Sequence, residues 1–118
     1  MSLHAATAAE LARGLRAKQY SAVEVAGHFL ERIEQANPAL NAFVTVTRER
    51  ALADAKRADA RLAKGEGGPL TGVPLAHKDI FCTTGILTSC GSRMLSNFVS
   101  PYDATVVERL DAAGMVLL

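Results

Sequence analysis

The sequence predicts an α/β fold in which helices pack on a mixed sheet. Two segments begin with helix-capping patterns, a charged helical segment follows them, and short apolar segments separate the helical ones. The expected order is helix, helix, strand, helix, strand, helix, strand, which is typical of layered α/β domains. A chain of 118 residues can bury one hydrophobic core. We therefore expect residues 1–118 to belong to a single domain.

Two helix starts stand out near the N-terminus. Thr7 and Glu10 have the spacing of a capping box, in which a hydroxyl and a carboxylate each satisfy a free backbone amide. This spacing predicts a first helix over about residues 8–18. Ser21 and Glu24 repeat the pattern and are followed by apolar residues at helical spacing, which predicts a second helix.

The middle of the chain predicts a strand between two helices. The second helix is expected to stop at Asn37-Pro38, because the residue before a proline disfavours helical geometry. Residues 41–47 are rich in β-branched and aromatic side chains, which favours a strand. Residues 48–64 then predict a third helix whose mixed charges form a solvated face.

The second half predicts two strands around a final helix. The apolar stretch TGVPLAHKDIF, residues 71–81, is bounded by glycine and proline and is short enough for a strand. Asp103 is expected to cap a helix that runs to about Ala113, with Gly114 as its stop. Residues 115–118 are apolar and predict the start of a buried strand. We therefore expect the sequence to be the N-terminal portion of a longer protein.

Composition excludes several classes of function. Hydrophobic residues make up 49% of the chain, and the formal net charge is +1, so no overall excess of charge points to nucleic acid or an anionic membrane. No apolar stretch approaches the roughly 20 residues that a membrane span needs. The first residues lack the order of a secretory signal. We expect a cytoplasmic protein without a membrane partner.

Lys78 is the residue that the predicted strand does not explain. On an edge strand, a lysine discourages pairing between molecules, and its stem covers apolar surface while the ammonium reaches water. Alternatively, Lys78 points inward from the end of a central strand, where burial disfavours its charged form and makes the amine a usable base. Asp79 is expected to point to the opposite face and to hold backbone or a loop in place.

Other catalytic groups have less support. Cys90 with His77, or Ser89 or Ser92, could supply a nucleophile, but nothing nearby in the sequence supplies the required base and orienting group. Cys82 and Cys90 are expected to be free thiols, with a redox pair as the alternative. The three histidines lack metal-ligand spacing, so we expect no metal and no cofactor in this chain.

Four segments together carry a resemblance to a known family. They are Gly65–Phe81, Thr88–Ser92, Ser100–Thr105 and Val106–Gly114. The chain resembles the N-terminal region of the amidase signature family over nearly its whole length. His77 and Ile80 replace residues that are commonly seen beside the family's lysine, while Lys78 itself is kept.

The resemblance implies an α/β/α fold and a Lys-Ser-Ser triad in which Lys78 is the lysine. Held neutral, Lys78 would accept a proton through a bridging serine that follows a cis peptide bond. That serine would activate a nucleophilic serine, which attacks a carboxamide, while backbone amides of a Gly/Ser-rich loop stabilise the oxyanion. Both serines and the loop are expected after residue 118, so the chain alone is expected to be inactive.

Within the family, the resemblance points to the glutamine-hydrolysing subunits of tRNA-dependent amidotransferases. Such a protein would release ammonia from glutamine for the conversion of Glu-tRNA(Gln) to Gln-tRNA(Gln). It would work in a heterotrimer with companion B and C subunits, one of which uses ATP and Mg²⁺, and would meet charged tRNA through the complex. The alternatives are an amidase that acts alone on another carboxamide and a truncated, non-catalytic module for subunit assembly.

Overall fold

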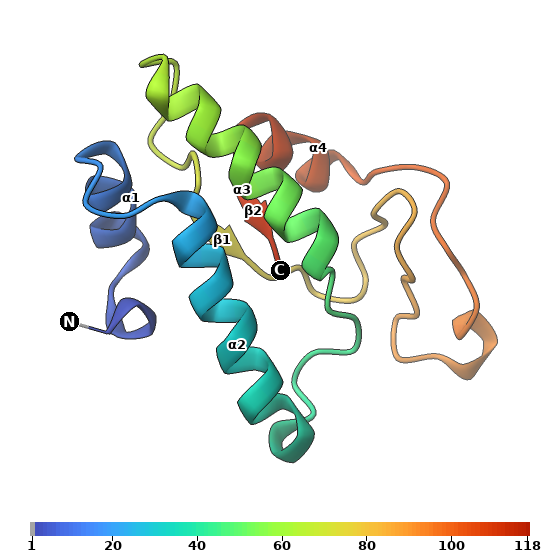
Figure 1. Ribbon diagram of the computed structural model, residues 1–118. Coiled ribbons are helices and arrows are strands. Elements are labelled where there is room, and N and C mark those ends of the chain that lie inside the picture. The colour runs from blue at the N-terminus through green and yellow to red at the C-terminus, as the bar shows by residue number, and fades with distance from the viewer. Residues whose placement is uncertain (1) are drawn as a thin grey trace.

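A computed structural model describes residues 2–118 of the chain (Figure 1). The elements in chain order are η1 (Leu3–Ala5), α1 (Ala8–Arg16), α2 (Ala22–Leu40), α3 (Arg48–Ala63), β1 (Pro74–Leu75), η2 (Arg93–Leu95), α4 (Thr105–Ala112) and β2 (Val116–Leu117). In the described part of the chain, no helix is both long and apolar enough to cross a membrane.

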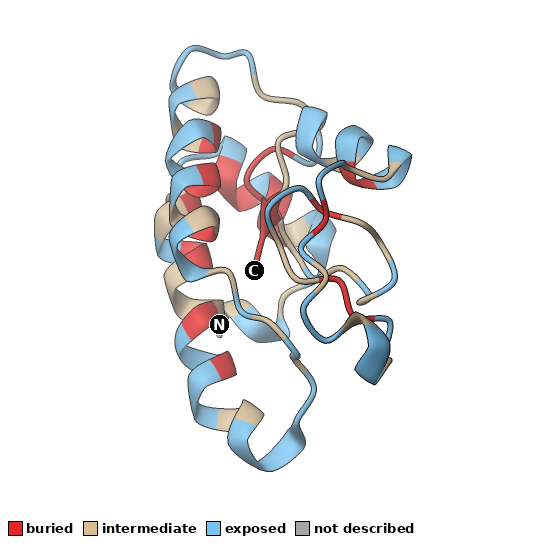
Figure 2. Cartoon of the chain, turned by 90° about the vertical axis from the view of Figure 1, so that its right-hand side faces the viewer, coloured by how far each residue is buried: buried red, intermediate tan, exposed pale blue. Residues whose placement is uncertain are grey.

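The α/β prediction is confirmed, with a parallel strand pair beside the helices. β1 and β2 pair in parallel, with Pro74 opposite Val116 and Leu75 opposite Leu117. α2 and α3 pack against each other, and they also contact β1 and β2, respectively. Figure 2 shows buried residues where the helices face the strands and exposed residues on the outer helix faces. The strands therefore lie under a layer of helices.

Both predicted capping boxes are present. The Glu10 N–H donates to the Thr7 hydroxyl at 3.2 Å, and the Thr7 N–H donates to the Glu10 carboxylate at 2.7 Å. Ser21 and Glu24 exchange the same pair of bonds at 3.1 and 2.8 Å. Because backbone N–H groups donate to them, the pKa values of Glu10 and Glu24 lie below the ordinary range of a glutamate.

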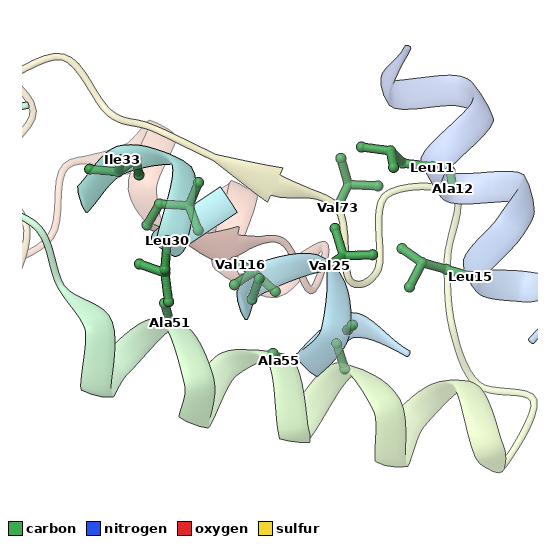
Figure 3. Packing of buried hydrophobic residues seen from close by; sticks show 14 residues of the cluster. Leu11, Ala12, Leu15, Val25, Leu30, Ile33, Ala51, Ala55, Val73 and Val116 are labelled. Carbon is green, nitrogen blue, oxygen red and sulfur yellow. The ribbon is translucent and has the colours of Figure 1, made fainter. Parts of the chain in front are cut away.

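The core is built from branched side chains on α1, α2 and the strands and from alanines on α3. Figure 3 shows Leu30 pointing toward Ala51, and Val116 above Ala55. Alanines on α3 leave room for the larger side chains of the neighbouring elements. Each fully buried Val or Leu contributes about 1.5–3 kcal/mol. The buried apolar members are Leu11, Ala12, Leu15, Ala22, Val25, Ala26, Leu30, Ile33, Ala51, Ala55, Ala58, Val73, Val116 and Leu118.

Gly72, just before β1, is required by both its backbone geometry and its packing. Its φ is +84°, a region that favours glycine. A Cβ at this position would lie 3.1 Å from side-chain atoms of Leu15 and Ala22. The Gly72 N–H donates to the carbonyl of Gly114 at 2.8 Å. Gly72 therefore brings the start of β1 close to α1, to α2 and to the end of α4.

The second helix does not stop at Asn37-Pro38 as predicted. α2 continues through Pro38 to Leu40 and ends at Asn41, whose φ is +50°. A proline removes one backbone donor, and here it lies in the last turn, where little helix remains to be disrupted. The Asn41 N–H donates to the Asn37 carbonyl at 2.7 Å, so the final turn remains closed.

The strand predicted for residues 41–47 does not form. The burial pattern still alternates, with Phe43, Thr45 and Thr47 half-buried and the intervening residues exposed. A strand also needs a ladder partner, and within residues 2–118 no strand pairs with this segment. The Asn37 side chain instead satisfies both backbone groups of Phe43, at 2.8 and 3.0 Å.

The charged face of α3 is only partly solvated, contrary to the prediction. Asp54 is 6% exposed and accepts a hydrogen bond from Arg57 at 2.6 Å. Arg50 lies 3.5 Å from the other Asp54 oxygen, and Arg57 also reaches Asp111 of α4 at 3.2 Å. The pair between Arg57 and Asp111 connects α3 to α4, so charges on this face have a structural role.

Two helical glycines provide a matched test of the packing. In α1, a Cβ at Gly14 would lie 2.0 Å from the Tyr20 hydroxyl, which bonds the carbonyls of Glu10 and Leu11. In α2, a Cβ at Gly27 would meet nothing within 4 Å. We predict that Gly14→Ala lowers the free energy of unfolding by about 1–3 kcal/mol. Gly27→Ala should raise it by about 1 kcal/mol.

Equilibrium urea unfolding of the two variants measures both values. The packing described for α1 is wrong if Gly14→Ala stabilises the chain as much as Gly27→Ala does.

Candidate active site

A cleft of about 250 Å³ lies at the carboxyl ends of β1 and β2. Its walls come from residues 42–47, from the segment 76–88 and from Leu117 and Leu118. Figure 1 shows the C-terminal end of the chain beside the segment that follows β1. The carboxyl ends of parallel strands are where α/β folds place ligands. Small-molecule pockets typically measure about 300–1,000 Å³, so the described residues enclose room for a small polar group.

Lys78 lines this cleft, but not in the way the sequence predicted. β1 ends at Leu75, so Lys78 lies beyond the strand and is exposed. It therefore does not protect an edge strand within the β1–β2 pair. The described residues also do not bury it as the predicted inward-pointing base. Lys78 is instead an exposed residue that lines the cleft.

Asp79 has the holding role that the sequence predicted. Its carboxylate accepts a hydrogen bond from the Ser89 N–H at 2.9 Å and a second, very short one from the Ser89 hydroxyl. Its backbone carbonyl accepts from the Cys90 N–H at 2.8 Å. These bonds fasten the segment that carries Lys78 to residues 88–92.

His77 is a half-buried wall residue of the same cleft. Burial lowers the pKa of its imidazole, and the nearby Arg50 guanidinium lowers it further, whereas the Asp103 carboxylate partly offsets both effects. Its ring meets Phe81 edge-on, with ring centroids 6.2 Å apart. The lowered pKa keeps His77 uncharged at neutral pH, so it adds no positive charge beside Lys78.

Asp103 does not cap the final helix. α4 begins at Thr105 after Ala104 and has no side-chain cap. The Asp103 carboxylate instead accepts the Thr84 N–H at 2.7 Å, and this hydrogen bond lowers its pKa below the ordinary range of an aspartate. A capping aspartate and one that binds a distant loop look the same in sequence. The carboxylate thus joins the segment 76–88, through Thr84, to the residues just before α4.

The other nucleophile candidates have structural roles. The Ser92 hydroxyl accepts the Met94 N–H at 3.2 Å and so caps η2, while Ser89 bonds Asp79. Cys82 and Cys90 are free, as predicted, and the Cys82 thiol lies 3.4 Å from the Tyr102 hydroxyl. Across residues 2–118, no group of three or more potential ligands could hold a metal ion.

Two features of the cleft could not be predicted from the sequence. Residues 42–47 form one wall although they are distant in sequence from Lys78, and the Thr47 hydroxyl reaches the Leu117 carbonyl at 3.4 Å. Arg50 influences His77 from α3. Both depend on contacts between elements that are far apart in the chain. The only available signal was the β-branched composition of residues 41–47.

The family of the chain follows from comparison with known proteins. The family described as Amidase matches residues 24–118. The A subunit of the glutamyl-tRNA(Gln) amidotransferase of Methylococcus capsulatus is 63% identical over 116 residues, which is 98% of this chain and 24% of that protein. The chain belongs to the amidase family. It spans about a quarter of the length of the relatives that it matches.

Solved structures agree with this assignment. A bacterial aryl acylamidase of the amidase signature family superposes with a TM-score of 0.88 at 30% identity, over 96% of this chain and 24% of that one. The peptide amidase of Stenotrophomonas maltophilia gives 0.85 at 32% identity, over 94% of this chain and 23% of that one. The arrangement of helices around β1 and β2 is therefore that of the amidase fold.

The surroundings of His77 predict that its imidazole titrates below the ordinary pKa of a histidine. Because its folded pKa is lowered, the unfolded chain binds the proton first as pH falls. This histidine therefore favours folding fully above about pH 6.5, and its contribution is lost as pH drops toward the lowered value.

Asp103→Asn keeps an acceptor for Thr84 but removes the charge that raises the pKa of His77. We predict a still lower midpoint in this variant, measured by NMR of the imidazole.

An unchanged or raised midpoint in Asp103→Asn would show that Asp103 does not act on His77 through its charge. A midpoint above about 6.5 in the unaltered chain would contradict the burial of the ring.

Proposed function

We propose that this chain forms the lysine-bearing part of an amidase subunit that releases ammonia from glutamine. The observation that carries the proposal is the placement of Lys78. It lines a cleft at the carboxyl ends of two parallel strands, on backbone that Asp79 fastens in place. Membership of the amidase family makes amide hydrolysis the reaction that fits this arrangement.

The proposed chemistry uses Lys78 as the final proton acceptor. A nucleophilic serine attacks the carboxamide carbon of glutamine and passes its proton to a bridging serine, which passes its own proton to Lys78. Ammonia leaves with a returned proton, and water hydrolyses the remaining glutamyl ester. Both serines and the Gly/Ser-rich oxyanion loop belong to the rest of the full-length protein in this proposal, so the 118-residue chain alone is expected to be inactive.

The exposure of Lys78 sets a condition on this chemistry. A neutral amine is favoured by burial, and the described residues leave Lys78 exposed. In the proposed enzyme, other parts of the full-length protein or the bound substrate cover it.

Sequence identity favours an amidotransferase subunit over an amidase that acts alone. The chain shares 63% identity with a relative named as the A subunit of a glutamyl-tRNA(Gln) amidotransferase, against 30% and 32% with the acylamidase and the peptide amidase. By this proposal, the ammonia converts Glu-tRNA(Gln) to Gln-tRNA(Gln) in a cytoplasmic heterotrimer. The companion B and C subunits then complete the enzyme, and one of them uses ATP and Mg²⁺ on the charged tRNA.

The test is substitution of Lys78 in the full-length protein, assayed for ammonia release from glutamine. We predict that Lys78→Ala lowers kcat by at least about 100-fold, the usual contribution of a general base. Lys56 on α3 is also exposed but does not line the cleft, so Lys56→Ala serves as the control and should retain activity. Circular dichroism shows whether both variants fold.

Activity of a folded Lys78→Ala variant within a few-fold of the parent would refute the role of Lys78 as base. A soluble, monodisperse 118-residue chain that binds companion subunits would instead support the truncated, non-catalytic assembly module.

A further inference from the structure

We propose that Asp79 is a positioning residue for Lys78, acting through its bonds to Ser89 and Cys90. This inference rests on the proposed function, because it assumes that Lys78 acts on the substrate. It concerns a residue that does not touch the reacting atoms. Its role is to fix the backbone from which Lys78 reaches into the cleft.

The hydrogen bonds around Asp79 come from one short segment. The Ser89 N–H donates to one carboxylate oxygen at 2.9 Å, and the Ser89 hydroxyl donates to the other. The Cys90 N–H donates to the Asp79 carbonyl at 2.8 Å. Hydrogen bonds to a carboxylate are shorter and stronger than those between neutral groups. Asp79 is therefore held on both its side chain and its backbone.

The Ser89 side of this link is buried, and Asp79 is half-buried. Ser89 is only 9% exposed and Thr88 2%, whereas Lys78 is exposed. Thr88 also lines the cleft, directly before the serine that bonds Asp79. The link therefore joins the two ends of the wall formed by the segment 76–88, one of which carries Lys78 and the other Thr88.

Lys78 lies between two fixed points. On one side, Leu75 is held in register with Leu117 by the strand pair. On the other, Asp79 is bonded to Ser89, and the Phe81 N–H donates to the Lys78 carbonyl at 3.1 Å, closing a turn. With both sides held, the Lys78 backbone has little freedom. Removing the Asp79 carboxylate would break the bonds to Ser89 and leave this side held by backbone hydrogen bonds alone.

Asp79 and Lys78 do not form an ion pair. Within residues 2–118, the ion pairs join other residues, and none joins Lys78 to Asp79. The carboxylate of Asp79 is occupied by Ser89 instead. We therefore assign the influence of Asp79 on Lys78 to the hydrogen bonds that position the backbone, and not to an ion pair. A misplacement of about 1 Å at a catalytic group can cost about 100-fold in rate.

The experiment uses the full-length protein with glutamine and measures kcat and KM. We expect Asp79→Ala to lower kcat by about 10–100-fold while KM changes less than about threefold. Ser89→Ala should act in the same direction. The double variant should be no worse than Asp79→Ala, because both changes break one link. Asp79→Asn should restore part of kcat, since its amide oxygen can still accept the Ser89 N–H.

Ser96→Ala is the matched control, because Ser96 is exposed on the same segment and does not line the cleft. It should leave kcat unchanged. If Asp79→Ala does not fold, Ser89→Ala and Asp79→Asn test the positioning role in its place. A lowered kcat with KM changed less than about threefold supports the role in these variants too.

Lys78→Ala, assayed in parallel, separates this inference from the proposed function. If Lys78→Ala is inactive but folded Asp79→Ala keeps kcat within about twofold, the positioning role is refuted and the proposed function stands. Additive losses in the double variant, or a loss confined to KM, would also refute the positioning role. If Lys78→Ala itself stays active, the proposed function fails, and the positioning role fails with it.

Discussion

The parallel pairing of β1 with β2 is the constraint on which the rest of the structure depends. It places residues 72–75 beside residues 114–118, with Gly72 bonded to Gly114 before the strands begin. α2 and α3 bury their apolar faces against these strands. The candidate site opens where the pair ends. Without this pairing, neither the core nor the cleft would have its present shape.

Beyond β1, side-chain hydrogen bonds act together with a short antiparallel bridge between Leu87 and Val99. The segment between β1 and α4 is largely irregular, yet Asp79 fastens it to Ser89, and Asp103 fastens it to Thr84. Each carboxylate satisfies backbone N–H groups that lack a ladder partner. An irregular segment held in this way can present Lys78 and His77 to a cleft while its backbone stays fixed. Asp79 and Asp103 therefore hold the backbone of the cleft-lining segment 76–88.

The helices could be predicted from sequence because their signals are local. Thr7 with Glu10 and Ser21 with Glu24 specify helix starts within a single turn, and the structure confirms them. The segment 41–47 has the composition of a strand, but strand formation depends on a partner elsewhere in the chain. Asp103 carries the signal of a cap, yet it bonds Thr84. Asp79 was correctly predicted to hold a loop, although the sequence could not show that its partner is Ser89.

In the proposed function, the cleft around Lys78 receives the amide substrate. Hydrogen exchange of the full-length protein, with and without glutamate as the product of the proposed reaction, tests this claim directly. We expect slower exchange in residues 76–88, which form a wall of the cleft, and no change in α1, which does not line it. Protection elsewhere, with residues 76–88 unchanged at saturating glutamate, would contradict it.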